Sequence, residues 1–142
     1  KDEYDYIFID CPPSLGLLTI NSLVASDSIL IPIQCEYYAL EGVSSLMNTF
    51  KLVKNGLNKK IEIQGVLLSM YDSRTKLSEQ VEDEVLSYFK DKVYRTTIPR
   101  NVRLAEAPSY GQPVIDYAPS SKGAKAYRKL AKEFVKFEGD EI

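Results

Sequence analysis

Runs of apolar residues recur along the chain and predict strands. The runs "YIFIDC" (6–11), "SILIPI" (28–33) and "IEIQGVLLSM" (61–70) predict fully buried strands, and "KVYRTTIP" (92–99) predicts a shorter one. Continuous apolar strands are typical of a parallel sheet, because helices cover both of its faces.

The segments between these runs have apolar residues at helical spacing. They predict helices over residues 16–26, 40–57, 77–89 and 120–137. We expect Ser78 to cap the third of these helices. On the last helix we expect four residues to face the core: Tyr127, Leu130, Ala131 and Phe134.

The alternation of strands and helices predicts the fold class. It favours an α/β domain with a mostly parallel sheet and helices on both faces, and we expect one such domain over residues 1–142. The segment 98–117 holds three of the seven prolines and is expected to be irregular. Long irregular segments in compact domains are often functional.

Composition narrows the class of protein further. Histidine is absent and the two cysteines form no CxxC pair, so a zinc-type site is not expected. No apolar run approaches the roughly 20 residues of a membrane span. We therefore expect a cytoplasmic protein with free thiols. The net charge of −2 is unevenly distributed: residues 1–50 carry one base and seven acids, whereas residues 95–136 carry nine bases and three acids. A basic region of this kind can meet phosphates.

Asp10 is the first candidate site residue, because a predicted buried strand ends on it. Cys11, Pro12 and Pro13 follow and exclude regular structure. Ligands of open α/β sheets bind beyond the carboxyl ends of the strands. A carboxylate there is suited to orient a hydrated Mg²⁺ beside nucleotide phosphates. From this pattern alone, an Asp10 that only ends the strand or caps the next helix is an equally good interpretation.

Three longer motifs carry a resemblance that covers essentially the whole chain. The string "YDYIFIDCPPSLGLLTINSLVASDSILIPIQCEYYALEG" resembles the Walker B region of the ParA/Soj chromosome- and plasmid-partition ATPases, a deviant-Walker group that includes MinD. "GVLLSMYDSRTKLSEQV" and "IPRNVRLAEAPSYGQPVIDYAPSSKGAKAYRKLAKE" resemble later motifs of the same family, in the same order. The fold implied is that of a P-loop NTPase.

The resemblance implies roles for individual residues. Asp10 resembles the Walker B acid that holds Mg²⁺ through water, and Cys11 and Pro12 begin the segment that senses the γ-phosphate. Met70 corresponds to the end of a strand that flanks the base. Pro99 and Asn101 correspond to an adenine-side loop. No catalytic residue is assigned.

Two arginines match positions at which the family contacts DNA without sequence preference. They are Arg74, in the turn "YDSRT", and Arg103, in "PRNVR". An arginine beyond a strand end can reach a phosphate with its rigid fork. Read without the resemblance, both are ordinary solvated surface arginines. Arg100 is closer to the adenine-side loop and is ambiguous.

The chain departs from the family in one respect. The glycine-rich "KGGVGKT"-type phosphate loop is absent, and the seven glycines are scattered. We therefore expect the C-terminal portion of a partition ATPase that is inactive by itself and does not bind ATP tightly alone. The resemblance implies that the parent protein binds ATP and Mg²⁺, forms a homodimer and binds nonspecific DNA and a ParB-type partner. Its implied location is cytoplasmic and nucleoid-associated.

Two other functions are weighed against this one. A MinD-type membrane-cycling ATPase is disfavoured because the apolar face of the last helix has core spacing and the chain closes on "EGDEI", which anionic lipid repels, so we expect no membrane contact. A receiver-like phospho-switch module also places an aspartate at a strand end. It needs an earlier acidic pair, for which Asp10 stands too near the start.

The missing phosphate-loop strand has a structural consequence. In the family it lies between the strand at 6–10 and the strand at 28–33. Without it, both strands have an open edge, and open edges recruit other strands. We therefore expect the fragment to self-associate, most simply as a dimer.

Overall fold

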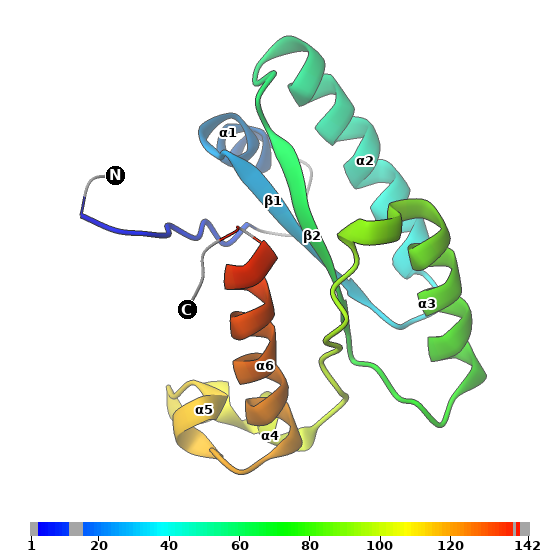
Figure 1. Cartoon of the computed structure of the whole chain (residues 1–142), viewed down its shortest axis with the longest axis vertical. Helices are drawn as coiled ribbons and strands as arrows, with labels where there is room; N and C mark the ends of the chain where they lie inside the picture. The colour runs from blue at the N-terminus through cyan, green and yellow to red at the C-terminus, as the bar shows by residue number, and fades with distance from the viewer. Residues whose placement is uncertain (1–2, 12–15, 138, 140–142) are drawn as a thin grey trace. The chain divides into compact units, whose positions relative to one another are not determined.

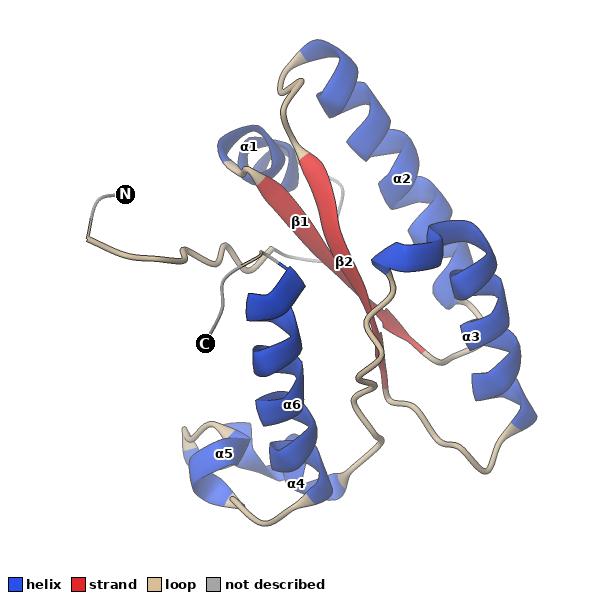
Figure 2. Ribbon diagram, viewed as in Figure 1, coloured by secondary structure: helices blue, strands red, loops and turns tan. Residues whose placement is uncertain are grey.

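The computed structural model of the protein describes residues 3–11, 16–137 and 139. Helices and strands alternate along these residues as far as residue 89 and only helices follow, as Figures 1 and 2 show. In chain order the elements are α1 (Leu17–Ala25), β1 (Ser28–Gln34), α2 (Ala39–Gly56), β2 (Glu62–Ser69), α3 (Lys76–Phe89), η1 (Lys90–Lys92), α4 (Val102–Glu106), η2 (Ala107–Tyr110), α5 (Val114–Tyr117) and α6 (Lys122–Phe137).

β1 and β2 pair side by side in one sheet. At their start, the amide of Glu62 donates to the carbonyl of Asp27 over 3.3 Å, and at their end the amide of Cys35 donates to the carbonyl of Ser69 over 2.9 Å. The two strands therefore run parallel. On the other edge of β2, segment 93–99 adds two parallel bridges, Val66–Val93 and Tyr71–Pro99. The predicted parallel α/β sheet is confirmed.

Contacts along the backbone divide the chain into two compact units. The first comprises residues 1–29 and 44–62, and the second comprises residues 30–43 and 63–142. The expectation of one domain over residues 1–142 stays a prediction.

In the first unit, Asn58 forms hydrogen bonds to the C-terminal end of α1. Its side-chain amide donates to the carbonyls of Leu23 at 3.0 Å, Val24 at 3.2 Å and Ser26 at 2.8 Å. Carbonyls at a helix C-terminus have no partner within the helix. One side chain from the loop before β2 thus supplies donors that α1 lacks.

The second unit has its core where β2, segment 93–99 and α6 meet. Leu67, Tyr94 and Ile98 are buried there, and Leu130 and Phe134 of α6 pack against them. Within this unit α3 and α6 lie on opposite sides of β2 (Figure 1). The prediction of helices on both faces is confirmed in this unit.

The predicted strand at 6–11 is wrong. Described residues 3–11 belong to neither strand, and the exposed fractions of Ile7 and Phe8 are 61% and 72%. A strand is stable only beside another strand that pairs its backbone groups. Within the described residues, β1 pairs with β2 and with no further strand.

The predicted strand at 92–99 is only partly formed. The amides of Tyr94 and Ile98 donate to carbonyls of β2, at 2.9 Å each. The amides of Arg95 and Thr96, between them, donate instead to the carboxylate of Glu133 on α6, at 2.6 and 3.0 Å. A carboxylate from α6 therefore replaces part of the strand ladder.

Three local predictions also need correction. The cap of α3 is Thr75, whose hydroxyl accepts from the amide of Ser78 at 3.3 Å, whereas Ser78 itself is buried.

On α6, Tyr127 and Ala131 are exposed rather than packed in the core, because Ala126, Leu130 and Phe134 form the face that meets β2. Segment 98–117 is not irregular throughout, since it forms α4, η2 and α5.

Among the residues that the structure describes, no helix has both the length and the apolar character needed to cross a membrane.

Candidate functional site

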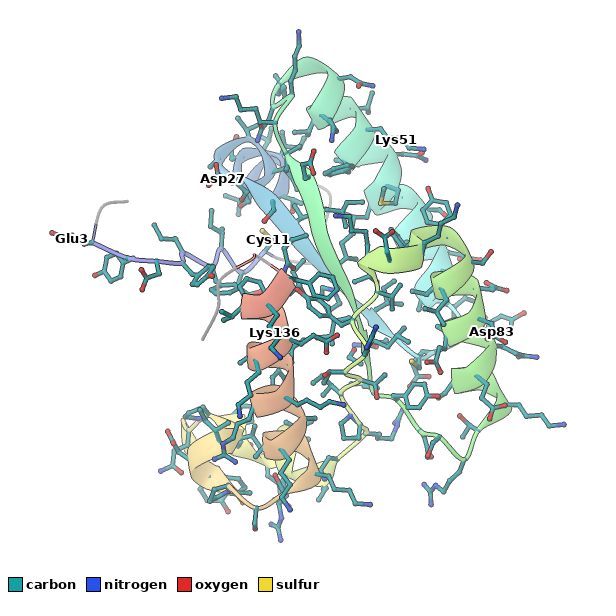
Figure 3. All side chains as sticks on the ribbon, viewed as in Figure 1. Glu3, Cys11, Asp27, Lys51, Asp83 and Lys136 are labelled. Atoms are coloured by element: carbon teal, nitrogen blue, oxygen red, sulfur yellow. The ribbon has the colours of Figure 1, made fainter. Side chains whose placement is uncertain are left out.

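The predicted nucleotide residues fall into both units. Asp10 and Cys11 belong to the first, and both are exposed. The thiol of Cys11 lies 3.6 Å from the carbonyl oxygen of Ile9, and Figure 3 marks its place beside the extended N-terminal segment. Pro12 lies outside the described residues.

The structure brings Met70 and Pro99 to one edge of the second unit. Met70 directly follows β2, and the next residue, Tyr71, forms the parallel bridge to Pro99. The amide of Tyr71 donates to the carbonyl of Ile98 at 3.0 Å, and the amide of Arg100 donates to the carbonyl of Tyr71 at 3.1 Å. Both predicted base-side residues therefore stand at the carboxyl ends of parallel strands, where α/β proteins bind their ligands.

Met70 has a strained backbone. Its φ is +51°, a left-handed conformation that is uncommon for a residue with a side chain, and 42% of its surface is exposed. Strained backbone of this kind clusters at functional sites.

Asn101 shapes the loop that follows Pro99. It is the N-cap of α4, and its side-chain oxygen accepts from the amide of Arg103 at 2.9 Å. A contact from Asn101 to a base can be made by its amide nitrogen or by the second lone pair of its oxygen.

An ion pair that the sequence did not predict joins this loop to β1. Arg100 contacts the carboxylate of Glu36, which follows the end of β1. Glu36 stands three residues after the apolar run 28–33, and nothing in the local sequence pairs it with Arg100. The pair places the ambiguous Arg100 against an acid within the second unit.

Three titratable residues, Tyr71, Glu82 and Cys35, lie near the end of β2. The hydroxyl of Tyr71 donates to the carboxylate of Glu82 on α3 at 2.6 Å, and this bond raises the pKa of Tyr71 to about 12. Burial, together with the nearby carboxylates of Glu82 and Glu36, raises the pKa of the Cys35 thiol to about 11. Cys35 is therefore a protonated, unreactive thiol at neutral pH.

The two predicted DNA arginines are exposed and each has a carboxylate partner. The side chain of Arg74 is 87% exposed and contacts Asp72 at 2.8 Å. The side chain of Arg103 is 53% exposed and contacts Glu106 at 2.8 Å. Hydrogen bonds from Arg74 hold the pKa of Asp72 well below its usual range.

An open apolar hollow of about 420 Å³ lies elsewhere in the second unit. Its lining comprises Leu104, Ala107, Pro108, Gln112, Pro113, Val114, Ile115, Tyr127, Arg128 and Ala131. None of the residues predicted to bind nucleotide or DNA is in that lining. The hollow is therefore not the predicted site.

Comparison with known proteins gives the family context. A family model described as an AAA domain matches residues 1–63. The chain is 65% identical to the sporulation initiation inhibitor protein Soj of Bacillus subtilis over 94% of this chain and 53% of that protein. It is 58% identical to the chromosome partitioning protein ParA of Myxococcus xanthus over 94% of this chain and 47% of that protein.

Solved structures share the fold. Cobyrinic acid a,c-diamide synthase from Mycobacterium smegmatis, with bound ADP and magnesium, matches with a TM-score of 0.75 and 33% identity, over 97% of this chain and 49% of that one. The septum site-determining protein MinD from Pyrococcus horikoshii, complexed with Mg-ADP, matches with a TM-score of 0.76 and 27% identity, over the whole of this chain and 56% of that one. The chain therefore spans about half the length of the proteins it matches.

Proposed function

Because this chain belongs to the ParA/Soj family of chromosome-partitioning ATPases by homology over 94% of its length, we propose that its protein binds Mg-ATP and nonspecific DNA during chromosome partition. The observation that carries the proposal is 65% identity to Soj across nearly the whole chain. Dimerisation, a ParB-type partner and a cytoplasmic, nucleoid-associated location form part of the same proposal. Two MinD structures resemble the chain at 27% and 31% identity, compared with 65% for Soj, which favours partition over membrane cycling.

The residues present fit one part of a nucleotide site. Met70 and Pro99 stand together at the carboxyl edge of the parallel strands, which suits contact with a base. Asp10 offers an exposed carboxylate, and no group of three or more acidic, cysteine or histidine ligands occurs within the described residues. Mg²⁺ is commonly held by one or two carboxylates together with water and phosphate. The chain thus suits the base and metal sides, and its sequence has no glycine-rich loop to cradle the phosphates.

The proposed DNA contacts are made by Arg74 and Arg103. Both guanidinium groups are exposed in the second unit and can reach phosphate oxygens from outside the fold. Contacts to phosphate give affinity without sequence preference, because they read no base edge. Such binding weakens with salt in proportion to the number of phosphates neutralised.

We predict that Arg74→Ala and Arg103→Ala each weaken binding to a random-sequence duplex and leave ATP binding intact. Each lost phosphate contact flattens the slope of log affinity against log salt, by up to about 0.9. The measurement is fluorescence anisotropy on the full-length protein with Mg-ATP, over a series of salt concentrations. Arg95→Ala is the matched control, because Arg95 is an exposed arginine of the same unit. Unchanged slopes in both variants contradict the proposed DNA contacts.

A further inference from the structure

Arg74 is held in place by an acid two residues before it. Its Nε donates to Oδ1 of Asp72 at 2.9 Å, and its terminal nitrogen donates to Oδ2 at 2.8 Å. The backbone amide of Arg74 also donates to Oδ1, at 3.1 Å. The side chain of Asp72 is only 22% exposed, compared with 87% for Arg74. The carboxylate is therefore fixed in the turn after β2, and the guanidinium lies across it.

Arg103 also contacts an acid, through a single hydrogen bond on a different element. One of its terminal nitrogens donates to Oε2 of Glu106, one turn later on α4, at 2.8 Å. The hydroxyl of Tyr117 donates to the same oxygen at 3.2 Å. Glu106 is thus held from α5 as well as from α4. Both arginines proposed to contact DNA lie against a carboxylate that neighbouring groups fix.

The pairing matters because a phosphate uses the same donors. A guanidinium binds a carboxylate or a phosphate through two parallel N–H groups on one edge. At Arg74, Asp72 already occupies such an edge. A DNA phosphate must either displace the carboxylate or approach a remaining N–H group with the carboxylate charge nearby.

We propose that Asp72 and Glu106 limit the DNA affinity of the protein by competing with backbone phosphates for Arg74 and Arg103. This inference rests on the proposed function, since it needs these arginines to meet DNA. Each acid cancels most of the positive charge of its arginine. Fewer counterions are therefore released from the DNA when the protein binds. DNA binding is thereby kept weaker and less salt-sensitive than two unpaired arginines allow.

The expected size of the effect follows from the exposure of the pairs. Ion pairs between exposed side chains are weak, so a phosphate displaces the carboxylate at little cost. Repulsion between two like charges about 4 Å apart in water lowers affinity roughly fivefold. Repulsion of the phosphate thus outweighs any benefit from holding the guanidinium in position. Removing the negative charge strengthens binding.

The test neutralises one acid at a time. Asp72→Asn keeps an oxygen that can accept from the amide of Arg74, so the turn is preserved. We expect a roughly three- to tenfold lower Kd for random-sequence duplex, with a steeper salt dependence. In the Arg74→Ala background the gain from Asp72→Asn disappears. Glu106→Gln, tested with and without Arg103→Ala, provides an independent second pair.

Asp83→Asn is the matched control for total charge. Asp83 is exposed on α3, and Figure 3 shows it on the outer side of that helix. The variant makes the same change in formal charge, and we expect less than a twofold change in Kd. An equal gain from Asp83→Asn overturns the proposal, because the effect is then one of overall charge.

The remaining outcomes separate the inference from the function on which it rests. If Arg74→Ala and Arg103→Ala weaken binding but neither neutralised acid strengthens it, the inference fails and the proposed function stands. Weaker binding in both Asp72→Asn and Glu106→Gln, with unchanged circular dichroism spectra, shows that the acids orient the arginines for DNA and also overturns the inference. If no arginine variant changes affinity, the proposed DNA contacts fail first.

Discussion

At the scale of single residues, Glu133 supports segment 93–99 through three hydrogen bonds. Its carboxylate accepts from the amides of Arg95 and Thr96 and from the hydroxyl of Thr96, at 2.6, 3.0 and 2.5 Å. Thr96 is 3% exposed, so water cannot replace its two bonds to Glu133. The same segment leads to Pro99 and Asn101, and Glu133 therefore supports the candidate base-side loop from α6.

We predict that Glu133→Ala lowers the free energy of unfolding by about 1–3 kcal/mol, the cost of leaving buried polar groups without partners. Chemical denaturation followed by circular dichroism measures the change. Lys132→Ala, at the exposed neighbouring position of α6, is the control and is expected to shift stability by less than about 0.5 kcal/mol. A loss no larger than that of the control means that Thr96 finds other partners.

At the scale of elements, two glycines differ in the space that a neighbouring element leaves beside their helix. A methyl group added at Gly123, in α6, would lie 2.7 Å from Cγ of Leu104 on α4. Gly42, in α2, has nothing within 4 Å of the same methyl group. Alanine favours a helix over glycine by up to about 1 kcal/mol, whereas overpacking costs about 1–3 kcal/mol. We predict that Gly42→Ala raises the urea midpoint and Gly123→Ala lowers it. Two changes of equal sign contradict the close contact between α4 and α6.

The elements also show what the sequence could and could not reveal. The strands near 28–33 and 61–70 and the longer helices were predictable, because each has a local apolar pattern of the right period. The pattern at 92–99 is equally apolar, but two of its amides bind Glu133, which lies 37 and 38 residues further on. A strand at 6–11 needs a neighbouring strand to pair with, and the local pattern of apolar residues does not show whether one is present.

The candidate site divides in the same way. Met70 and Pro99 were assigned from family resemblance, and the structure brings them to one edge through Tyr71. Asp72 lies two residues from Arg74, so their pairing was open to prediction from the turn sequence. The pair formed by Glu36 and Arg100 joins positions 64 residues apart, and no local pattern indicates it.

At the scale of the whole molecule, apolar side chains remain uncovered in the first unit. Ile7, Leu17 and Leu18 are 61%, 78% and 69% exposed. Large exposed apolar surfaces promote association. We predict that the 142-residue chain self-associates, most simply as a dimer, at tens of micromolar. Light scattering measures the mass, and Ile7→Lys with Leu17→Lys is expected to return it toward that of a monomer. A monodisperse wild-type monomer contradicts the prediction.

The bonds from Glu133 to Arg95 and Thr96 also impose an order on biosynthesis. The carboxylate that completes segment 93–99 is encoded 37 residues after Thr96. At roughly 5–20 residues per second, translation supplies it about 2–7 s after Thr96 itself. During that interval β1 and β2 are already complete in the nascent chain and β2 can pair with Tyr94 and Ile98, whereas the amides of Arg95 and Thr96 still lack their acceptor. The segment that leads to the base-side loop therefore completes its hydrogen bonds only after Glu133 has been synthesised.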